Sequence, residues 1–243
     1  MIYVYALAYY CLEYTERFID SIVANASEPI HLTILENRSE RSSELESSIL
    51  HRIEIGKVQT FIQFKDNLML QAYRYGYQLN LPGEDSDAFV MVTDSDVLFH
   101  KPVDWIGEMR RAFGFSEVGI MGWPTDMSNF YDTPNKAFGE LRAYFDIKYG
   151  FCPQTNFGGY FTCIRKQQLD AFMQTSLAIA DAVLIGFIQQ SGFITGRFEH
   201  EVYHQGWDAW RDYPDYFKLK LERHWDLSAT FPPLHNYKIT RQT

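Results

Sequence analysis

The sequence predicts an α/β fold built on an open, mainly parallel sheet with helices on both faces. Short apolar runs recur through the first hundred residues, as in strands that are buried on both faces. Segments with apolar residues three and four positions apart, typical of amphipathic helices, separate these runs. The chain has 243 residues, 46% of them hydrophobic, which is enough for one substantial core. We therefore expect a single domain over residues 1–243.

Strands and helices are expected to alternate strictly in the first half. The expected strands are 2–8, 30–35, 58–64 and 88–92, and the expected helices are 13–24, 40–50 and 67–79. This alternation indicates a parallel sheet, and ligands of such sheets bind at the carboxyl ends of the strands. The second half is less regular. We expect strands at 118–121, 160–164 and 217–221, helices at 167–173 and 178–190, and an irregular segment at 128–158 that orders when a ligand binds.

Composition excludes some classes of protein. The net charge is −9, and the sequence contains no block of Lys and Arg residues. Both features argue against a nucleic-acid binder. An acidic protein that binds a phosphorylated ligand usually does so through a divalent cation or backbone amides. Aromatic residues make up 16% of the chain, which suits either a cleft for flat bases and sugars or an aromatic-rich core.

Cysteine usage and hydropathy bear on the compartment. Cys11, Cys152 and Cys163 are too few and too scattered for a disulfide framework or a zinc site, so we expect reduced thiols and a cytoplasmic protein. Residues 1–10 are expected to be a strand rather than a signal peptide, because no basic leader precedes the apolar run. No stretch approaches the ~18 apolar residues of a membrane span, so no transmembrane segment is expected.

Two carboxylates follow the most hydrophobic expected strand. Asp94 and Asp96 are two residues apart, so on an extended segment they point to the same side. Such charges repel each other, and a Mn²⁺ or Mg²⁺ ion that joins them to a ligand's phosphates relieves the repulsion. The alternative is that they cap a helix or fill a turn. Residues 97–99 resume as a strand, which argues against a helix cap.

Four segments, taken in order, resemble glycosyltransferases of the GT-A fold, and most closely the family-2-type members. The segments are 3–10, 34–39, Asp66-Asn67 with the helix that contains Ala72, and 92–96. The resemblance implies a Rossmann-like sheet with a smaller mixed acceptor-side region. Residues 1–100 would form the nucleotide-binding half and residues 101–243 the acceptor-binding half. It also implies metal-dependent transfer of a sugar from a nucleoside diphosphate sugar, most often a UDP-sugar, to a hydroxyl on a glycan, lipid or protein.

The resemblance also implies roles for particular residues. Those implied to bind the nucleotide-sugar are Ala8, Tyr9, Glu36, Lys65, Asn67, Asp94, Ser95, Asp96 and Gly159, and those implied to bind the metal are Asp94, Asp96 and His224, with His235 as the alternative histidine. Ala8 and Tyr9 would line the base, and Glu36, where the family usually has Asp, would accept from its N–H. Each role has a plain structural alternative: Glu36 as a surface turn residue, Lys65 as a solvated side chain, and either histidine as a structural residue.

An inverting transfer needs a base to take the acceptor's proton. Family members carry an acidic motif at the start of a late helix, and residues 198–202 resemble it, with Glu199 as the first candidate and Glu201 as the second. The alternative is that these residues only complement the helix dipole. Retention is left open, because the residues 156–159 also fit retaining enzymes of this fold.

Three other functions fit less well. A haloacid-dehalogenase-type phosphatase would place Asp94 at the end of its first strand and would need a later Gly-Asp string. A nucleotidyltransferase would need a Gly-rich basic loop after the first strand, and residues 6–14 contain none. A non-catalytic nucleotide-sugar-binding module would keep the metal site and lose the base.

Overall fold

A computed structural model describes most of the chain. The described residues are 1–68, 71–82, 87–126, 161–176, 181–198, 200–216, 234 and 236–242, without the side chains of residues 181, 182 and 207. The first half confirms the expected alternation of strands and helices, with bounds that differ by up to four residues. Its elements are β1 (Ile2–Ala8), α1 (Leu12–Ala24), β2 (Ile30–Glu36), α2 (Ser42–Glu54), β3 (Thr60–Phe64), α3 (Gln71–Leu79) and β4 (Phe89–Asp94).

The second half contains shorter elements. They are β5 (Val97–Leu98), α4 (Trp105–Ala112), β6 (Val118–Gly122), β7 (Thr125–Asp126), β8 (Phe161–Arg165), α7 (Lys166–Met173), α8 (Asp181–Gln190), β9 (Ile194–Arg197), β10 (Val202–His204), the 3₁₀ helix η2 (Gln205–Asp208), α9 (Ala209–Asp212) and β11 (Tyr237–Arg241). The expected elements at 118–121, 160–164, 167–173 and 178–190 are confirmed where they are described. The expected strand at 217–221 and the segment 128–158 lie outside the described residues.

The main sheet has eight strands in the order β11-β3-β2-β1-β4-β8-β6-β9. The four strands of the first half are parallel, with β1 between β2 and β4, so Ala8 lies beside Glu36 and Leu7 beside Asp94. β8 runs antiparallel to β4 and β6, and β11 runs antiparallel to β3 at one edge. The carboxyl ends of β1, β2 and β4 therefore meet at one edge of the sheet.

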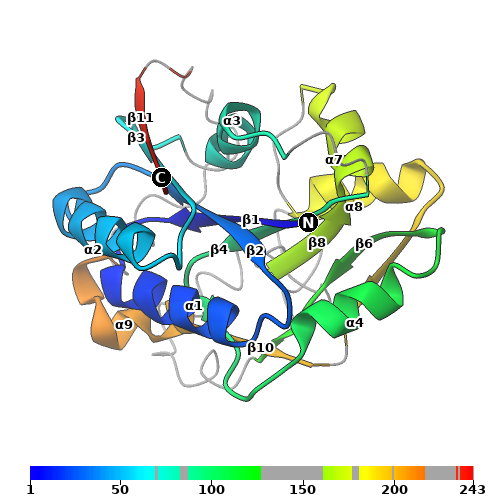
Figure 1. The fold of residues 1–243 in the computed structure, drawn as a ribbon, viewed down its shortest axis with the longest axis horizontal. Coiled ribbons are helices and arrows are strands. Elements are labelled where there is room, and N and C mark those ends of the chain that lie inside the picture. Colours follow the sequence, from blue (N-terminus) through cyan, green and yellow to red (C-terminus); the bar gives the residue numbers. More distant parts are fainter. Residues whose placement is uncertain are drawn as a thin grey trace.

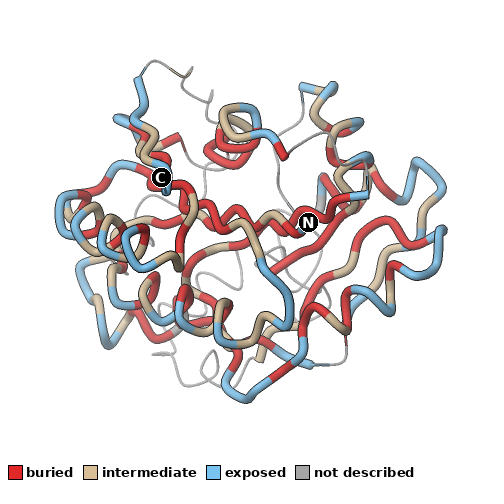
Figure 2. Tube along the Cα trace, viewed as in Figure 1, coloured by how far each residue is buried: buried red, intermediate tan, exposed pale blue. Residues whose placement is uncertain are grey.

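Helices cover both faces of this sheet (Figure 1). Helices α1, α2 and α4 lie on one face, and α3, α7 and α8 lie on the other. Alternate residues of β1 serve the two layers: Ile2, Val4 and Ala6 pack toward α1, whereas Tyr5 packs toward α3. Figure 2 accordingly shows buried residues along the central strands and on the inner faces of the helices.

A second sheet of three short strands, in the order β5-β10-β7, adjoins the main one. β10 pairs antiparallel with β5, which places His204 opposite Val97, and parallel with β7. Because Val97 directly follows Asp96, this pairing brings residues more than a hundred positions apart to the end of β4. No helix among the described residues is long and apolar enough to cross a membrane.

Candidate functional site

Asp94, Asp96 and His204 converge at the carboxyl end of β4. Asp94 is the last residue of β4, Asp96 lies in the turn to β5, and His204 is the last residue of β10. One ligand atom from each of the three lies within 4.8 Å of the others. The His204 Nε2 atom is 3.6 Å from the Asp96 Oδ1 atom. Two carboxylates and an imidazole at this spacing form a group that can hold a cation.

This donor set fits a divalent cation. Carboxylate oxygens suit Mg²⁺ and Mn²⁺, and an added imidazole nitrogen favours transition metals such as Mn²⁺ over Mg²⁺. The His204 side chain is 2% exposed and that of Asp96 is 18% exposed, so the ion would face solvent through the carboxylates. Gly206 borders the site, and a larger residue there would clash with it, because a Cβ atom would lie 2.4 Å from the Asp96 Oδ2 atom.

Hydrogen bonds hold the acidic turn in place from several sides. The Tyr73 hydroxyl donates to the Asp94 Oδ1 atom at 2.6 Å, and burial holds the pKa of Tyr73 well above its usual value. The Ser95 hydroxyl lies 2.8 Å from the hydroxyl of Thr15 on α1, and the backbone N–H of Ser95 donates to the Leu7 carbonyl. The turn that carries the two aspartates is therefore fixed before any ligand arrives.

The histidine of this group is not one that the sequence singled out. His224 and His235 both lie outside the described residues, so their expected role stays a prediction. His204 follows only two strand residues, and its place depends on the pairing of β10 with β5, a contact between distant segments. The short Val202-Tyr203 pair, with its β-branched and aromatic residues, was the one local signal for a strand there.

Glu36 is buried, which contradicts the alternative of a surface turn residue. Its side chain ends β2 and is 1% exposed. The Ser42 hydroxyl donates to one of its carboxylate oxygens, and Gln63 on the neighbouring strand also bonds to it. The Ser39 N–H donates to the Ser42 hydroxyl at 2.9 Å, and this bond closes the turn between the two serines. The carboxyl group thus lies beneath the edge where β1 and β2 end, beside Ala8.

Burial raises the pKa of Glu36 to about 7. The folded state therefore retains a proton that the unfolded chain releases near pH 4.5. Its contribution to the free energy of unfolding is fully present below pH 4.5 and is lost as the pH rises to about 7, a change of about 3 kcal/mol. We expect the Glu36→Gln variant to lose much less of its free energy of unfolding between pH 5 and pH 8 than the wild type does, as measured by urea unfolding at the two pH values. An unchanged fall in the variant would place the titrating group elsewhere.

Other nucleotide-site candidates gather near the same edge. Ala8 is buried at the end of β1, and Tyr9 follows it half-exposed. Lys65 is exposed just after β3 and Asn67 is half-exposed. Gly159 lies outside the described residues. The four described residues thus lie at the carboxyl ends of β1 and β3, as expected, while their contacts with a nucleotide stay predictions.

Four tyrosines, Tyr9, Tyr10, Tyr213 and Tyr216, form what we call the tyrosine cluster beside the acidic pair. The rings of Tyr10 and Tyr216 stack with centroids 5.3 Å apart, and Tyr9 lies 5.9 Å from Tyr216. Tyr10 has a φ of 65°, a left-handed conformation that is costly for a large side chain. Aromatic faces at this edge suit flat bases and the apolar faces of sugars. Part of the high aromatic content of the sequence, these four tyrosines, therefore lies beside the candidate site.

The expected helix start at 198–202 is wrong. Val202 begins the strand β10, and the preceding segment is tied to the second half of the sheet. The Phe198 ring stacks on Trp123 with centroids 4.0 Å apart, and His200 pairs with the buried Glu108. These tertiary contacts fix Phe198 and His200 just before β10. Glu201 is exposed just before β10, and Glu199 lies outside the described residues.

An α-helix, α9, starts at Ala209, directly after a carboxylate that the sequence did not single out. Asp208 ends η2 and precedes α9, and it is 8% exposed. The Tyr203 hydroxyl donates to it, and Arg211 lies 3.2 Å from its Oδ1 atom. Both carboxylate oxygens are therefore engaged within the protein, so this side chain braces the turn that follows His204.

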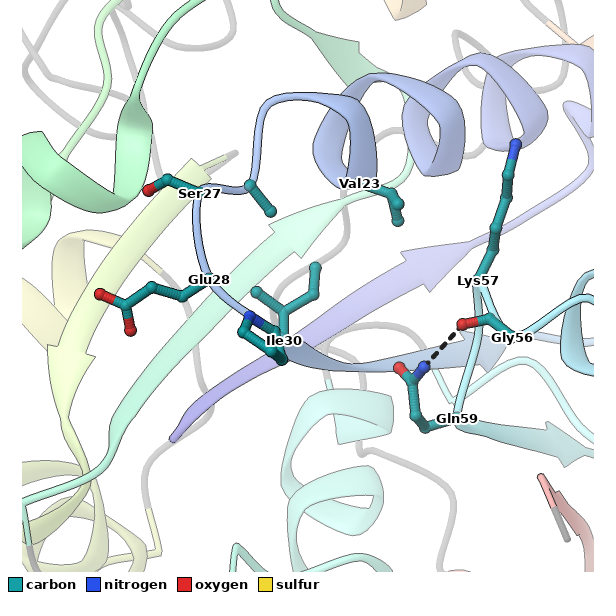
Figure 3. A pocket seen from close by; sticks show the side chains of 9 residues that line it. Val23, Ser27, Glu28, Ile30, Gly56, Lys57 and Gln59 are labelled. Atoms are coloured by element: carbon teal, nitrogen blue, oxygen red, sulfur yellow. Dashed lines mark hydrogen bonds between the residues drawn. The ribbon is translucent and has the colours of Figure 1, made fainter.

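A pocket of about 440 Å³ lies at the opposite edge of the sheet, near the start of β2 (Figure 3). It is lined by Val23, Ala26, Ser27, Glu28, Pro29, Ile30, Gly56, Lys57 and Gln59. Glu28 pairs with Arg110 and Lys57 with Asp20, and the amide of Gln59 donates to the Gly56 carbonyl. The pocket contains no candidate catalytic residue. The candidate site described above lies at the other edge of the sheet.

Solved structures share this fold, whereas the comparisons of sequence find no match. No protein-family model matches the chain, and no curated protein matches it. A mannosyltransferase, PcManGT from Pyrobaculum calidifontis in complex with GDP-Man and Mn²⁺, aligns with a TM-score of 0.61 and 14% identity. The alignment covers 96% of this chain and 66% of that one. The chain therefore spans just under two thirds of the mannosyltransferase.

Two further structures agree. Glucosyl-3-phosphoglycerate synthase from Mycobacterium tuberculosis, in complex with Mn²⁺, UDP and glucosyl-3-phosphoglycerate, aligns over 99% of this chain and 86% of its own, with a TM-score of 0.52 and 13% identity. TarS from S. aureus aligns over 93% of this chain and 66% of its own, with a TM-score of 0.54 and 11% identity. The chain shares the GT-A fold with these structures.

Proposed function

We propose that this protein is a metal-dependent glycosyltransferase that transfers a hexosyl group from a nucleoside diphosphate sugar to a hydroxyl acceptor. The observation that supports this most is the convergence of Asp94, Asp96 and His204 at the carboxyl end of β4. In a GT-A fold this is the edge at which a ligand binds. Mn²⁺, or Mg²⁺, held there would offset the charge that builds on the departing nucleoside diphosphate.

The chain's own residues would divide the work between two parts. Residues 1–100 would hold the nucleotide, with Ala8 and Tyr9 along the base and the carboxyl group of Glu36 beneath it. Lys65 and Asn67 would face the ribose or diphosphate, and Ser95 would keep the acidic turn in register. Residues 101–243 would bind the acceptor, a glycan, lipid or protein that supplies a hydroxyl group.

We assign an inverting transfer, in which a carboxylate of residues 199–201 takes the proton of the acceptor hydroxyl. Glu201 is exposed, and three residues of extended chain, roughly 10 Å, separate it from His204. Glu199 shares the segment and stays the first candidate from the sequence.

The direct test is a panel of nucleotide-sugars with UDP, GDP and other bases, scored by thermal unfolding with Mn²⁺ or with EDTA. A donor present at 100 times its dissociation constant stabilises the folded state by about 2.7 kcal/mol. For a domain of this size we expect a rise in Tm of about 5–10 °C with Mn²⁺ and none with EDTA. A protein that no nucleotide-sugar stabilises in Mn²⁺ would contradict the proposal.

A further inference from the structure

Tyr73 contacts the candidate metal site without being one of its ligands. It lies on α3, is 4% exposed, and donates its hydroxyl hydrogen to the Asp94 Oδ1 atom at 2.6 Å. A hydrogen bond with the backbone of Leu7 also reaches this hydroxyl. Leu7 is paired with Asp94 across β1 and β4. The phenol is therefore fixed against both strands whose ends form the site.

We propose that Tyr73 is a positioning residue that sets which oxygen of Asp94 faces the cation. This inference rests on the proposed function. A carboxylate has two equivalent oxygens and can turn about its last bond, so without a fixed donor it can bind a cation through either oxygen or both. The Tyr73 hydroxyl occupies one oxygen from the α3 side. The other oxygen then meets the cation together with Asp96 and His204.

The position of the bond in the fold suits this role. Asp94 ends β4, and beyond it the chain turns at Ser95, so the Tyr73 hydroxyl holds its carboxylate from a different element of the fold. α3 packs on β1 and β2 from the face opposite α1. From this helix the Tyr73 hydroxyl reaches Asp94 at the end of β4. Partners of metal ligands that orient them in this way typically change metal affinity by about 10–100-fold when they are removed.

The same helix offers a matched control. Tyr77, one turn further along α3, is 2% exposed and donates its hydroxyl hydrogen to the Asp170 Oδ1 atom, also at 2.6 Å. Tyr77→Phe therefore removes the same kind of bond from the same helix, and Asp170 lies on α7 rather than at the candidate site. Any loss of Mn²⁺ affinity that arises only from weakened packing of α3 would appear in both variants.

The experiment measures Mn²⁺ binding by electron paramagnetic resonance, with and without UDP or GDP, in the full chain and in the variants Tyr73→Phe and Tyr77→Phe. We expect the dissociation constant for Mn²⁺ to rise about 10–100-fold in Tyr73→Phe and to stay within about twofold in Tyr77→Phe, while both variants lose a similar amount of Tm. A second readout is the spectrum of bound Mn²⁺, whose line shape should broaden in Tyr73→Phe when Asp94 is free to rotate.

The outcomes separate this inference from the proposed function. Unchanged Mn²⁺ affinity and an unchanged spectrum in Tyr73→Phe, with the wild-type protein binding Mn²⁺, would overturn the positioning role alone. Equal losses in both variants would also overturn it, because they would show a general effect of α3. A wild-type protein that binds no Mn²⁺ even with nucleotide would refute the metal site itself, and with it both proposals.

Discussion

Replacing Asp96 by alanine is expected to abolish Mn²⁺-dependent binding of the nucleotide donor. In the proposed site Asp96 would supply one of three ligand groups. Its backbone carbonyl also accepts from the N–H of Gln205, which ties it to the segment that carries His204. The substitution removes the side chain and leaves that backbone bond. We expect the dissociation constant of the donor in Mn²⁺ to rise at least about 100-fold, which corresponds to about 2.7 kcal/mol, measured by calorimetry.

The control for this loss is Asp20→Ala. Asp20 is an exposed aspartate on α1 whose ion pair with Lys57 lies near the opposite edge of the sheet. Exposed ion pairs contribute little to stability, so this variant should bind donor and Mn²⁺ as the wild type does. If Asp96→Ala binds a nucleotide-sugar with wild-type affinity in Mn²⁺, the cation does not sit between the two aspartates, and the proposed function loses its main support.

The part of the fold that local sequence could predict is the part built from consecutive elements. β1, β2, β3 and β4 are short, largely apolar segments, each followed by an amphipathic helix or a turn, and β1, β2 and β3 pair in the order of the sequence. Asp94 and Asp96 could be assigned to the carboxyl end of a strand because that strand ends at a clear change from apolar to acidic residues. The comparison with solved structures confirms the fold that this pattern indicated.

What local sequence could not predict depends on contacts between distant segments. β10 has three residues, and it is a strand because it pairs with both β5 and β7. The same pairing brings His204 to the acidic pair among the described residues. The start of α4 does have a local signal in the sequence, Asp104, whose side chain accepts from the Gly107 N–H at 2.9 Å and caps the helix.

The burial of Glu36, which rules out the surface-turn alternative, also depends on residues outside its own segment. An acidic residue that follows an apolar strand reads as the start of a surface turn, and local composition alone gives no reason to bury it. The structure buries it because Ser39 and Ser42 fold the next turn over it and Gln63 reaches it from β3. The polar partners of a buried carboxyl group thus lie partly outside its own segment.

The second large expected effect concerns the base. Glu199→Gln and Glu201→Gln each keep the shape of the side chain and remove its basicity, so donor binding should persist in both. In the variant that removes the true base, kcat for transfer should fall by about 10²–10⁴-fold, and its pH dependence on the acidic side should vanish. The measurement is transfer to an acceptor, with Mn²⁺-dependent donor binding recorded on the same preparation.

Asp208→Asn is the comparison that makes this test decisive. Asp208 is the described carboxylate at a helix start in this part of the chain, but Tyr203 and Arg211 engage both of its oxygens. Its replacement should therefore lower Tm and change kcat much less than the loss of the base does. If Asp208→Asn keeps donor binding and loses transfer while both glutamine variants stay active, the base is Asp208, and the bonds to Tyr203 and Arg211 orient a catalytic group. If all three variants transfer normally, no carboxylate of this segment takes the proton, and a retaining reaction without an enzymic base of this kind becomes the better explanation.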